Sequence, residues 1–308
     1  MIKTKRLGEW FEITLPSEWD GLSIDSILRD KWEAPKKHIH LMRMEKEVKI
    51  NGEFIPWQKP LSTGDKIQIR LFQQTEFGVT PEFFDIEIVY EDDHIIVFNK
   101  PANMDTHPNS QNEVDTLANA AAYYLLTQGE FRKIKHVHRL DRDTTGAVLF
   151  AKHPLAGAIL DRMLEERKIK RTYLALVHGV MKANKGTIRE PIGRDRHHPT
   201  RRRVSPTGQS AITHYEVLET FPKEKFTLIQ CQLATGRTHQ IRVHLSFLGH
   251  PLVGDGLYGG QPIIKRQALH AAKLVIPHPF TEELISCHAL SAQEPFLDKY
   301  FQDWPNRL

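Results

Sequence analysis

Cysteine is scarce in this chain, long apolar runs are missing, and the net charge is small. The 308 residues contain two cysteines, Cys231 and Cys287, too few for a disulfide framework or a four-thiolate zinc site. No window approaches the roughly 20 apolar residues that cross a membrane, and the N-terminus lacks the apolar segment of a secretory signal. We therefore expect a protein of the reducing cytoplasm that makes no membrane contact.

The composition that remains is that of a globular protein with an uneven charge distribution. Apolar residues make up 40% and charged residues 26%, which excludes disordered and fibrous classes. The net charge is +4, but residues 132–171 hold eleven Lys or Arg against five acids, and residues 182–203 hold eight against two. Residues 76–93 hold seven acids and neither Lys nor Arg. The two basic segments predict a polyanion-binding face, with a solvated surface stripe as the alternative.

The first seventy residues predict a small unit of two helices and a short sheet. Its second helix carries Lys36, Lys37 and Arg43, so its outer surface is basic. The acidic stretch that follows has no period and predicts a linker. Helices are expected over 23–32 and 35–46, strands over 48–50 and 66–71, and the linker over 76–85.

The rest of the chain contains more strand patterns than helix patterns. Two strands around an acidic turn predict a hairpin over 86–98, and neighbouring strands pair locally. We therefore expect an α+β domain, with a mixed, mainly antiparallel sheet flanked by helices, rather than a doubly wound fold. Further strands are expected over 146–152, 173–177, 210–219, 226–233 and 272–276, and helices over 116–126 and 154–166.

The densest chemical motif is His-Arg-Leu-Asp-Arg-Asp-Thr-Thr-Gly, residues 138–146. Its Asp141 lies between Arg139 and Arg142, and adjacent guanidinium groups favour the ionised carboxylate that a nucleophile or a charge stabiliser requires. The alternative is a turn in which Asp143 and Thr144 bind backbone donors.

A second cluster, Leu-Ala-Thr-Gly-Arg-Thr-His-Gln-Ile-Arg-Val-His-Leu, spans residues 233–245. It predicts a strand, a Thr-Gly turn and a helix. Arg237 at the mouth of the turn could reach an anion, whereas Gln240 and His244 could simply decorate the helix. Glycine-rich loops follow, among them Gly-Asp-Gly-Leu-Tyr-Gly at 254–259.

These motifs, in this order, closely resemble the pseudouridine synthases of the large-ribosomal-subunit type, the family that includes types A, C and D. The resemblance covers residue 86 to about 279. Residues 22–71 look like an S4-type RNA-binding domain, with a module for protein contacts as the alternative. We therefore predict an S4-like domain over 1–75, a linker over 76–85 and a catalytic domain over 86–308.

The resemblance implies a reaction and assigns residues to it. A uridine in RNA is isomerised to pseudouridine, with Asp141 either attacking the ribose or acting as a base during glycosidic cleavage. Arg237 is expected to pair with Asp141 and keep it ionised. Tyr173 would pack on the uracil, and Arg139 would replace the flipped nucleotide in the RNA stack. Lys36, Lys37 and Arg43 would bind RNA; neither a metal nor a cofactor is expected, and the protein is expected to be a monomer.

The same motifs leave alternative substrates and functions open. Ribosomal RNA is the first choice of substrate and transfer RNA the second. Residues 140–146 superficially match the nucleophile loop of haloacid-dehalogenase-type phosphatases, but such a loop follows an apolar strand, and residues 131–138 are not apolar. A noncatalytic RNA-binding protein is the third reading. The arginine-rich stretch 194–203 predicts a mobile loop that becomes ordered on RNA.

Overall fold

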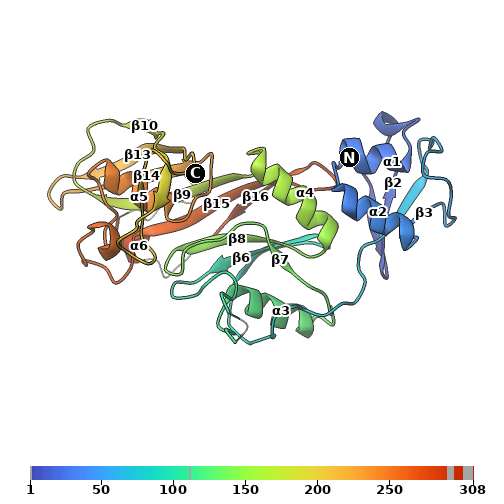
Figure 1. Cartoon of the computed structure of the whole chain (residues 1–308), viewed down its shortest axis with the longest axis horizontal. Coiled ribbons are helices and arrows are strands. Elements are labelled where there is room, and N and C mark those ends of the chain that lie inside the picture. Colours follow the sequence, from blue (N-terminus) through green and yellow to red (C-terminus); the bar gives the residue numbers. More distant parts are fainter. Residues whose placement is uncertain (1, 111, 290–294, 301–307) are drawn as a thin grey trace.

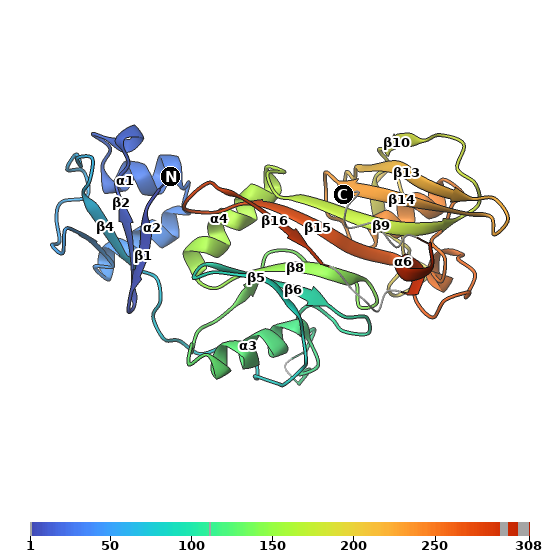
Figure 2. The same ribbon diagram turned by 180° about the vertical axis from the view of Figure 1, so that it is seen from behind.

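The computed structural model describes residues 2–110, 112–289, 295–300 and 308. Figures 1 and 2 show an elongated molecule, with a small N-terminal module (residues 2–72) at one end and a long twisted sheet that extends to the other. Within the described ranges no helix is long and apolar enough to cross a membrane. Residues 290–294 and 301–307 of the predicted catalytic domain lie outside the described residues.

The N-terminal module is built on a four-stranded antiparallel sheet of order β1-β2-β4-β3. The predicted first helix begins at its expected cap, where Ser23 Oγ accepts a hydrogen bond from Ser26 N, but it continues as a π-helix. Strands β1 and β2 were not predicted; every residue of β1 is exposed, so it shows no alternating pattern. The elements are β1 (Thr4–Leu7), β2 (Trp10–Thr14), η1 (Ser17–Trp19), α1 (Ile24–Ser26), η2 (Ile27–Lys31), α2 (Lys36–Met44), β3 (Val48–Ile50) and β4 (Lys66–Arg70).

The large sheet has the strand order β10-β13-β14-β9-β15-β8-β6-β5, with β16 paired to β15 and β7 to β8. The β15–β8 pair is parallel, and the other pairs described for this sheet are antiparallel. The predicted α+β class with a mixed, mainly antiparallel sheet is therefore confirmed. The strands are β5 (Ile88–Glu91), β6 (Ile95–Lys100), β7 (Lys135–His136), β8 (Thr145–Ala151), β9 (Lys170–His178), β10 (Lys185–Ile188), β13 (Thr213–Phe221), β14 (Phe226–Leu233), β15 (Leu269–Pro277) and β16 (Leu284–His288).

Helices cover the two faces of this sheet at β6 and β8. Successive side chains of a strand point to opposite faces, and Val97 shares a buried cluster with Leu155 of α4, whereas Phe98 shares one with Leu117 of α3. Figure 1 accordingly shows α3 and α4 on opposite sides of β6 and β8. The helices are α3 (Leu117–Thr127), α4 (Pro154–Glu165), α5 (Gln240–Phe247), η3 (Gly256–Tyr258) and α6 (Pro295–Tyr300).

The parallel pair β8–β15 depends on a glycine. Gly146 pairs with Ala271, and its φ of +109° lies in the region that favours glycine. A Cβ added at Gly146 would lie 2.3 Å from the carbonyl oxygen of Ala271. The two backbones can therefore approach only because residue 146 has no side chain.

The arginine-rich stretch 194–203 is flanked by two short paired strands that were not predicted, and its mobility and ordering on RNA stay a prediction. Strand β11 (Ile192–Arg194) pairs antiparallel with β12 (Arg202–Val204). Two apolar residues of the hairpin, Ile192 and Val204, pack with Val243 of α5. This packing fixes the hairpin, and counting charges along the stretch could not reveal it.

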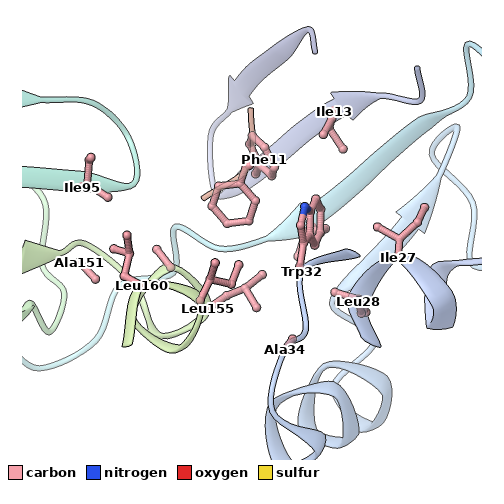
Figure 3. Close-up of a cluster of buried hydrophobic side chains, with 14 of the residues drawn as sticks. Phe11, Ile13, Ile27, Leu28, Trp32, Ala34, Ile95, Ala151, Leu155 and Leu160 are labelled. Atoms are coloured by element: carbon pink, nitrogen blue, oxygen red, sulfur yellow. The ribbon is translucent and has the colours of Figure 1, made fainter. Parts of the chain in front are cut away.

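The N-terminal module shares a hydrophobic core with the large sheet. Phe280, in the turn after β15, is fully buried, with its ring centroid 5.0 Å from that of Phe11 and 5.1 Å from that of Trp32. Figure 3 shows Phe11 and Trp32 in one cluster with Leu155 of α4. The segment predicted as a linker also lies against the protein, since Asn119 Nδ2 donates to the carbonyl of Thr80 at 2.8 Å.

Replacing Phe280 with alanine should therefore lower the free energy of unfolding by about 3–5 kcal/mol, because it leaves a cavity between the N-terminal module and the sheet. Denaturant unfolding followed by fluorescence would measure the loss. Leu284→Ala is the control, since Leu284 is 73% exposed and its truncation should cost less than about 0.5 kcal/mol. Equal losses in the two variants would contradict the shared core.

Candidate active site

The loop that carries Asp141 runs between β7 and β8, and the buried side chain of Lys100 holds it in place. Lys100 Nζ donates to the carbonyl oxygens of Met104 at 2.6 Å and Arg142 at 2.8 Å, and its side chain is fully buried. Burial lowers the pKa of Lys100 to about 7. Leu140 N donates to Thr106 Oγ1 at 3.2 Å, which fixes the residue immediately before Asp141.

The carboxylate of Asp141 is held by Arg242, in the first turn of α5. Arg242 Nη1 donates to Asp141 Oδ2 at 3.0 Å. The same guanidinium grips Asp255, with Nε donating to Oδ2 at 2.7 Å and Nη2 to Oδ1 at 2.9 Å. Burial lowers the pKa of Arg242, but the hydrogen bonds and charges of Asp255 and Asp141 outweigh it, so the net pKa is raised. Arg242 is therefore always charged beside Asp141.

The pairing predicted between Arg237 and Asp141 is wrong. Arg237 is exposed, and its Nε donates to the carbonyl of Ser210 at 3.1 Å. The Thr-Gly turn places Arg237 before α5 begins, whereas Arg242 lies inside the helix between the buried Ile241 and Val243. In the sequence, Arg242 stands between the apolar residues Ile241 and Val243. These neighbours are the sequence signal that Arg242 belongs to the buried part of α5.

The first residue of α5, Gln240, anchors the helix. Its Oε1 accepts hydrogen bonds from Thr235 Oγ1 at 2.8 Å and Arg237 N at 3.0 Å. Its Nε2 donates to Thr213 Oγ1 at 3.0 Å. Gln240 is therefore a structural part of the site that positions Arg242, two residues further along the same turn, and not surface decoration.

Tyr173 and Arg139 line a cleft with Asp141. The cleft has a volume of about 730 Å³, and Arg242 and Leu269 also contribute to its walls. Tyr173 comes from the centre of β9, is 4% exposed, and burial raises the pKa of its phenol. Arg139 also borders a smaller cavity of about 180 Å³ beside Asp141. All four predicted active-site residues, Asp141, Arg139, Tyr173 and Arg237, therefore line this cleft, and the structure adds Arg242 to them.

His239 and Tyr258 complete the surroundings of Asp141, and neither was predicted. Tyr258 Oη lies 2.8 Å from His239 Nδ1, and His239 Nε2 lies 3.9 Å from Asp141 Oδ2. The guanidinium of Arg242 lies 5.0 Å from the centre of the Tyr258 ring. Burial lowers the pKa of His239 and raises that of Tyr258 to about 12, so both side chains are neutral near pH 7.

A carboxylate in a cleft with an aromatic side chain suits chemistry at a glycosidic carbon. The ionised Asp141 can attack that carbon or stabilise positive charge on it. Tyr173 can pack against a planar base. Residues 94–247 match the family described as RNA pseudouridylate synthase.

The chain belongs to this family. Residues 11–67 match the family described as RluD ribosomal pseudouridine synthase N-terminal domain. Membership in this family leaves the hypothesis of a phosphatase loop at residues 140–146 without support. The strand before Asp141, β7, is also only two residues long, unlike the strand that a phosphatase loop requires.

Relatives of this pseudouridine synthase match over most of its length. An uncharacterized RNA pseudouridine synthase of Bacillus subtilis, YhcT, is 47% identical, with 92% of this chain and 94% of the relative covered. Ribosomal large subunit pseudouridine synthase D of Haemophilus ducreyi is 40% identical, covering 79% of this chain and 78% of the relative. The solved structure of human RNA pseudouridylate synthase domain containing 1 is 28% identical, with a TM-score of 0.57 over 70% of this chain and 87% of that one.

The basic residues predicted on the N-terminal module differ in their contacts: two are exposed lysines, and the third is an arginine with an acidic partner. Lys36 and Lys37 are exposed at the start of α2. Arg43 is bound to Asp25 at 2.6 Å and lies 4.7 Å from the centre of the Trp57 ring. The two lysines are therefore better placed than Arg43 to meet a phosphate.

Replacing Arg242 with glutamine should lower the free energy of unfolding by about 3–5 kcal/mol, because it leaves the carboxylate of Asp255 buried without its cation. The Asp255 side chain is only 1% exposed. Urea unfolding at neutral pH would measure the loss. Arg237→Gln is the matched control and should cost less than about 0.5 kcal/mol. A larger loss in Arg237→Gln than in Arg242→Gln would reverse the roles given to the two arginines.

Proposed function

We propose that this enzyme converts a uridine of large-subunit ribosomal RNA into pseudouridine, with Asp141 at the reacting sugar. The observation that carries the proposal is the ion pair of Asp141 with Arg242 in a cleft that Tyr173 also lines. The choice of RNA is supported by the 40% identical Haemophilus ducreyi relative, ribosomal large subunit pseudouridine synthase D. We also propose that it acts in the cytoplasm and as a monomer.

The reaction breaks the bond from C1′ to N1 and forms one from C1′ to C5. In one route a carboxylate oxygen of Asp141 bonds to C1′ as the uracil leaves, and C5 of the turned uracil then displaces it. In the other route Asp141 takes a proton from C2′ as the uracil leaves, which gives an unsaturated sugar. C5 then adds at C1′ while the protonated Asp141 returns the proton to C2′. Both routes end with loss of the C5 proton and protonation of N1. Arg242 Nη1 donates to Asp141 Oδ2 and orients the carboxylate for either role.

Two further side chains have roles around the base. Tyr173 packs against the detached uracil and holds it while it turns. A uridine in structured RNA must leave its stack before its sugar is reached. Arg139, at the mouth of both cavities, fills the space that the nucleotide vacates.

The N-terminal module is proposed to be an S4-like RNA-binding domain (residues 1–75) connected by residues 76–85 to the catalytic domain (86–308). Its match to the RluD N-terminal family supports an association with ribosomal pseudouridine synthases. Lys36 and Lys37, both exposed at the start of α2, are the residues that we propose contact RNA phosphates.

Replacing Asp141 with asparagine should abolish pseudouridine formation, because an amide is neither a nucleophile at C1′ nor a base at C2′. Tritium release from RNA labelled at uridine C5 would measure turnover, and filter binding should show that RNA is still held. Asp143→Asn is the matched control and should keep its turnover. Turnover in Asp141→Asn above the level without enzyme would remove Asp141 from this role.

Replacing Lys36 and Lys37 together with glutamine should weaken RNA binding and reduce the slope of log K against log salt by about two, if each lysine neutralises one phosphate. The rate at saturating RNA should not change, because α2 lies outside the catalytic cleft. The control replaces Lys3 and Lys5, two exposed lysines of the same module, and should leave the slope as it was. An unchanged slope in the Lys36 and Lys37 variant would show that α2 does not bind phosphates.

A further inference from the structure

A further cavity, of about 350 Å³, lies between the β11–β12 hairpin and the turn before α5. Three arginines line it: Arg194 and Arg202 from the hairpin, and Arg237 from the turn. None of the described residues that line it carries a carboxylate. We call this cavity the arginine pocket. Three guanidinium groups around one space create a strongly positive potential there.

The hairpin keeps two of these arginines together at an energetic cost. Arg194 and Arg202 lie directly opposite each other in the antiparallel pair, and like charges in that arrangement are destabilising. The nearby Asp195 does not line the pocket and is bound by Arg201, whose Nε donates to Oδ2 at 2.7 Å. In the described part of the chain Arg202 Nε is buried without a hydrogen-bond partner. An anion in the pocket would relieve both the repulsion and the unsatisfied donor.

The arginine pocket adjoins the catalytic cleft. Arg237 and Thr238 line both spaces. The hairpin is also tied to the cleft, because Arg202 N donates to Tyr258 Oη at 2.9 Å and Tyr258 Oη lies 2.8 Å from His239 Nδ1. An anion in the pocket is therefore held in a fixed position relative to Asp141.

We propose that the arginine pocket binds one phosphodiester group of the RNA backbone next to the flipped uridine. This inference rests on the proposed function, since the substrate must be RNA. A phosphate offers paired oxygens to the planar guanidinium fork, a geometry that favours arginine over lysine. Binding there would fix the register of the strand, so that one nucleotide faces Asp141.

The test uses two variants of the full-length protein, Arg194→Gln and Arg202→Gln, and their combination. Binding to a short single-stranded oligouridine is measured across a salt series. Each single variant should weaken binding about ten-fold or more, the loss expected for a hydrogen bond to a charged group. Each should also lower the slope of log K against log salt by about one. The double variant should lose no more slope than a single one, because both arginines serve the same phosphate.

Arg203→Gln is the matched control, because it removes the same charge from the same hairpin. Residue 203 alternates with 202 along β12, so its side chain points to the other face, and it does not line the pocket. It should keep most of the affinity that Arg202→Gln loses. Arg194 is exposed, so its replacement does not disturb the packing of the hairpin.

Two results would overturn the proposal: equal losses in Arg203→Gln and Arg202→Gln, or a double variant that loses twice the slope of each single one. The first result would indicate a diffuse charged surface and the second two separate phosphates. Pseudouridine formation by the wild-type protein is measured in parallel. Its absence would contradict the proposed function, while the salt series would still decide whether the pocket binds a phosphate.

Discussion

One guanidinium joins the two halves of the active site. Arg242 holds Asp255 with two of its nitrogens and Asp141 with the third. Because Asp255 is almost completely buried, it fixes the plane of the guanidinium, and that plane fixes the oxygen that Asp141 turns toward Arg242. A loop before β8 and a helix after β14 are thereby held in one geometry. Gln240 supports the arrangement by tying the start of α5 to β13.

The sequence predicted the local parts of this site better than the contacts across it. Asp141 stands out because its neighbours in the chain are charged and its motif is compact. Its partner Arg242 lies 101 residues further on, whereas the family resemblance implied Arg237 from its position in the Thr-Gly-Arg-Thr-His-Gln motif. The choice between two arginines depends on which side of α5 faces the sheet. That is a tertiary property, visible in sequence only through the buried neighbours of Arg242.

In the fold, too, local patterns were predicted and long-range contacts were not. The mixed sheet and helices α3 and α4 follow from strong patterns and were predicted. Strand β1 was missed because all its side chains are exposed, and β11–β12 because arginines mask the apolar Ile192 and Val204. The shared core at Phe280 was also missed. Its aromatic partners Phe11 and Trp32 lie more than two hundred residues away in the chain. They belong to the N-terminal module, which the acidic linker pattern separates from the catalytic domain in the sequence.

The absent side chain at Gly146 sets a dimension of the catalytic cleft. In the sheet Gly146 pairs with Ala271, and Ala271 pairs on its other side with Tyr173. A single strand, β15, therefore lies between the end of the Asp141 loop on β8 and Tyr173 on β9, and the backbones of β8 and β15 approach too closely at Gly146 for a side chain. A larger residue at 146 would have to separate β8 from β15, because the atoms it would meet belong to the main chain of Ala271. The relative position of Asp141 and Tyr173 therefore depends on a backbone contact that side-chain rotation cannot adjust.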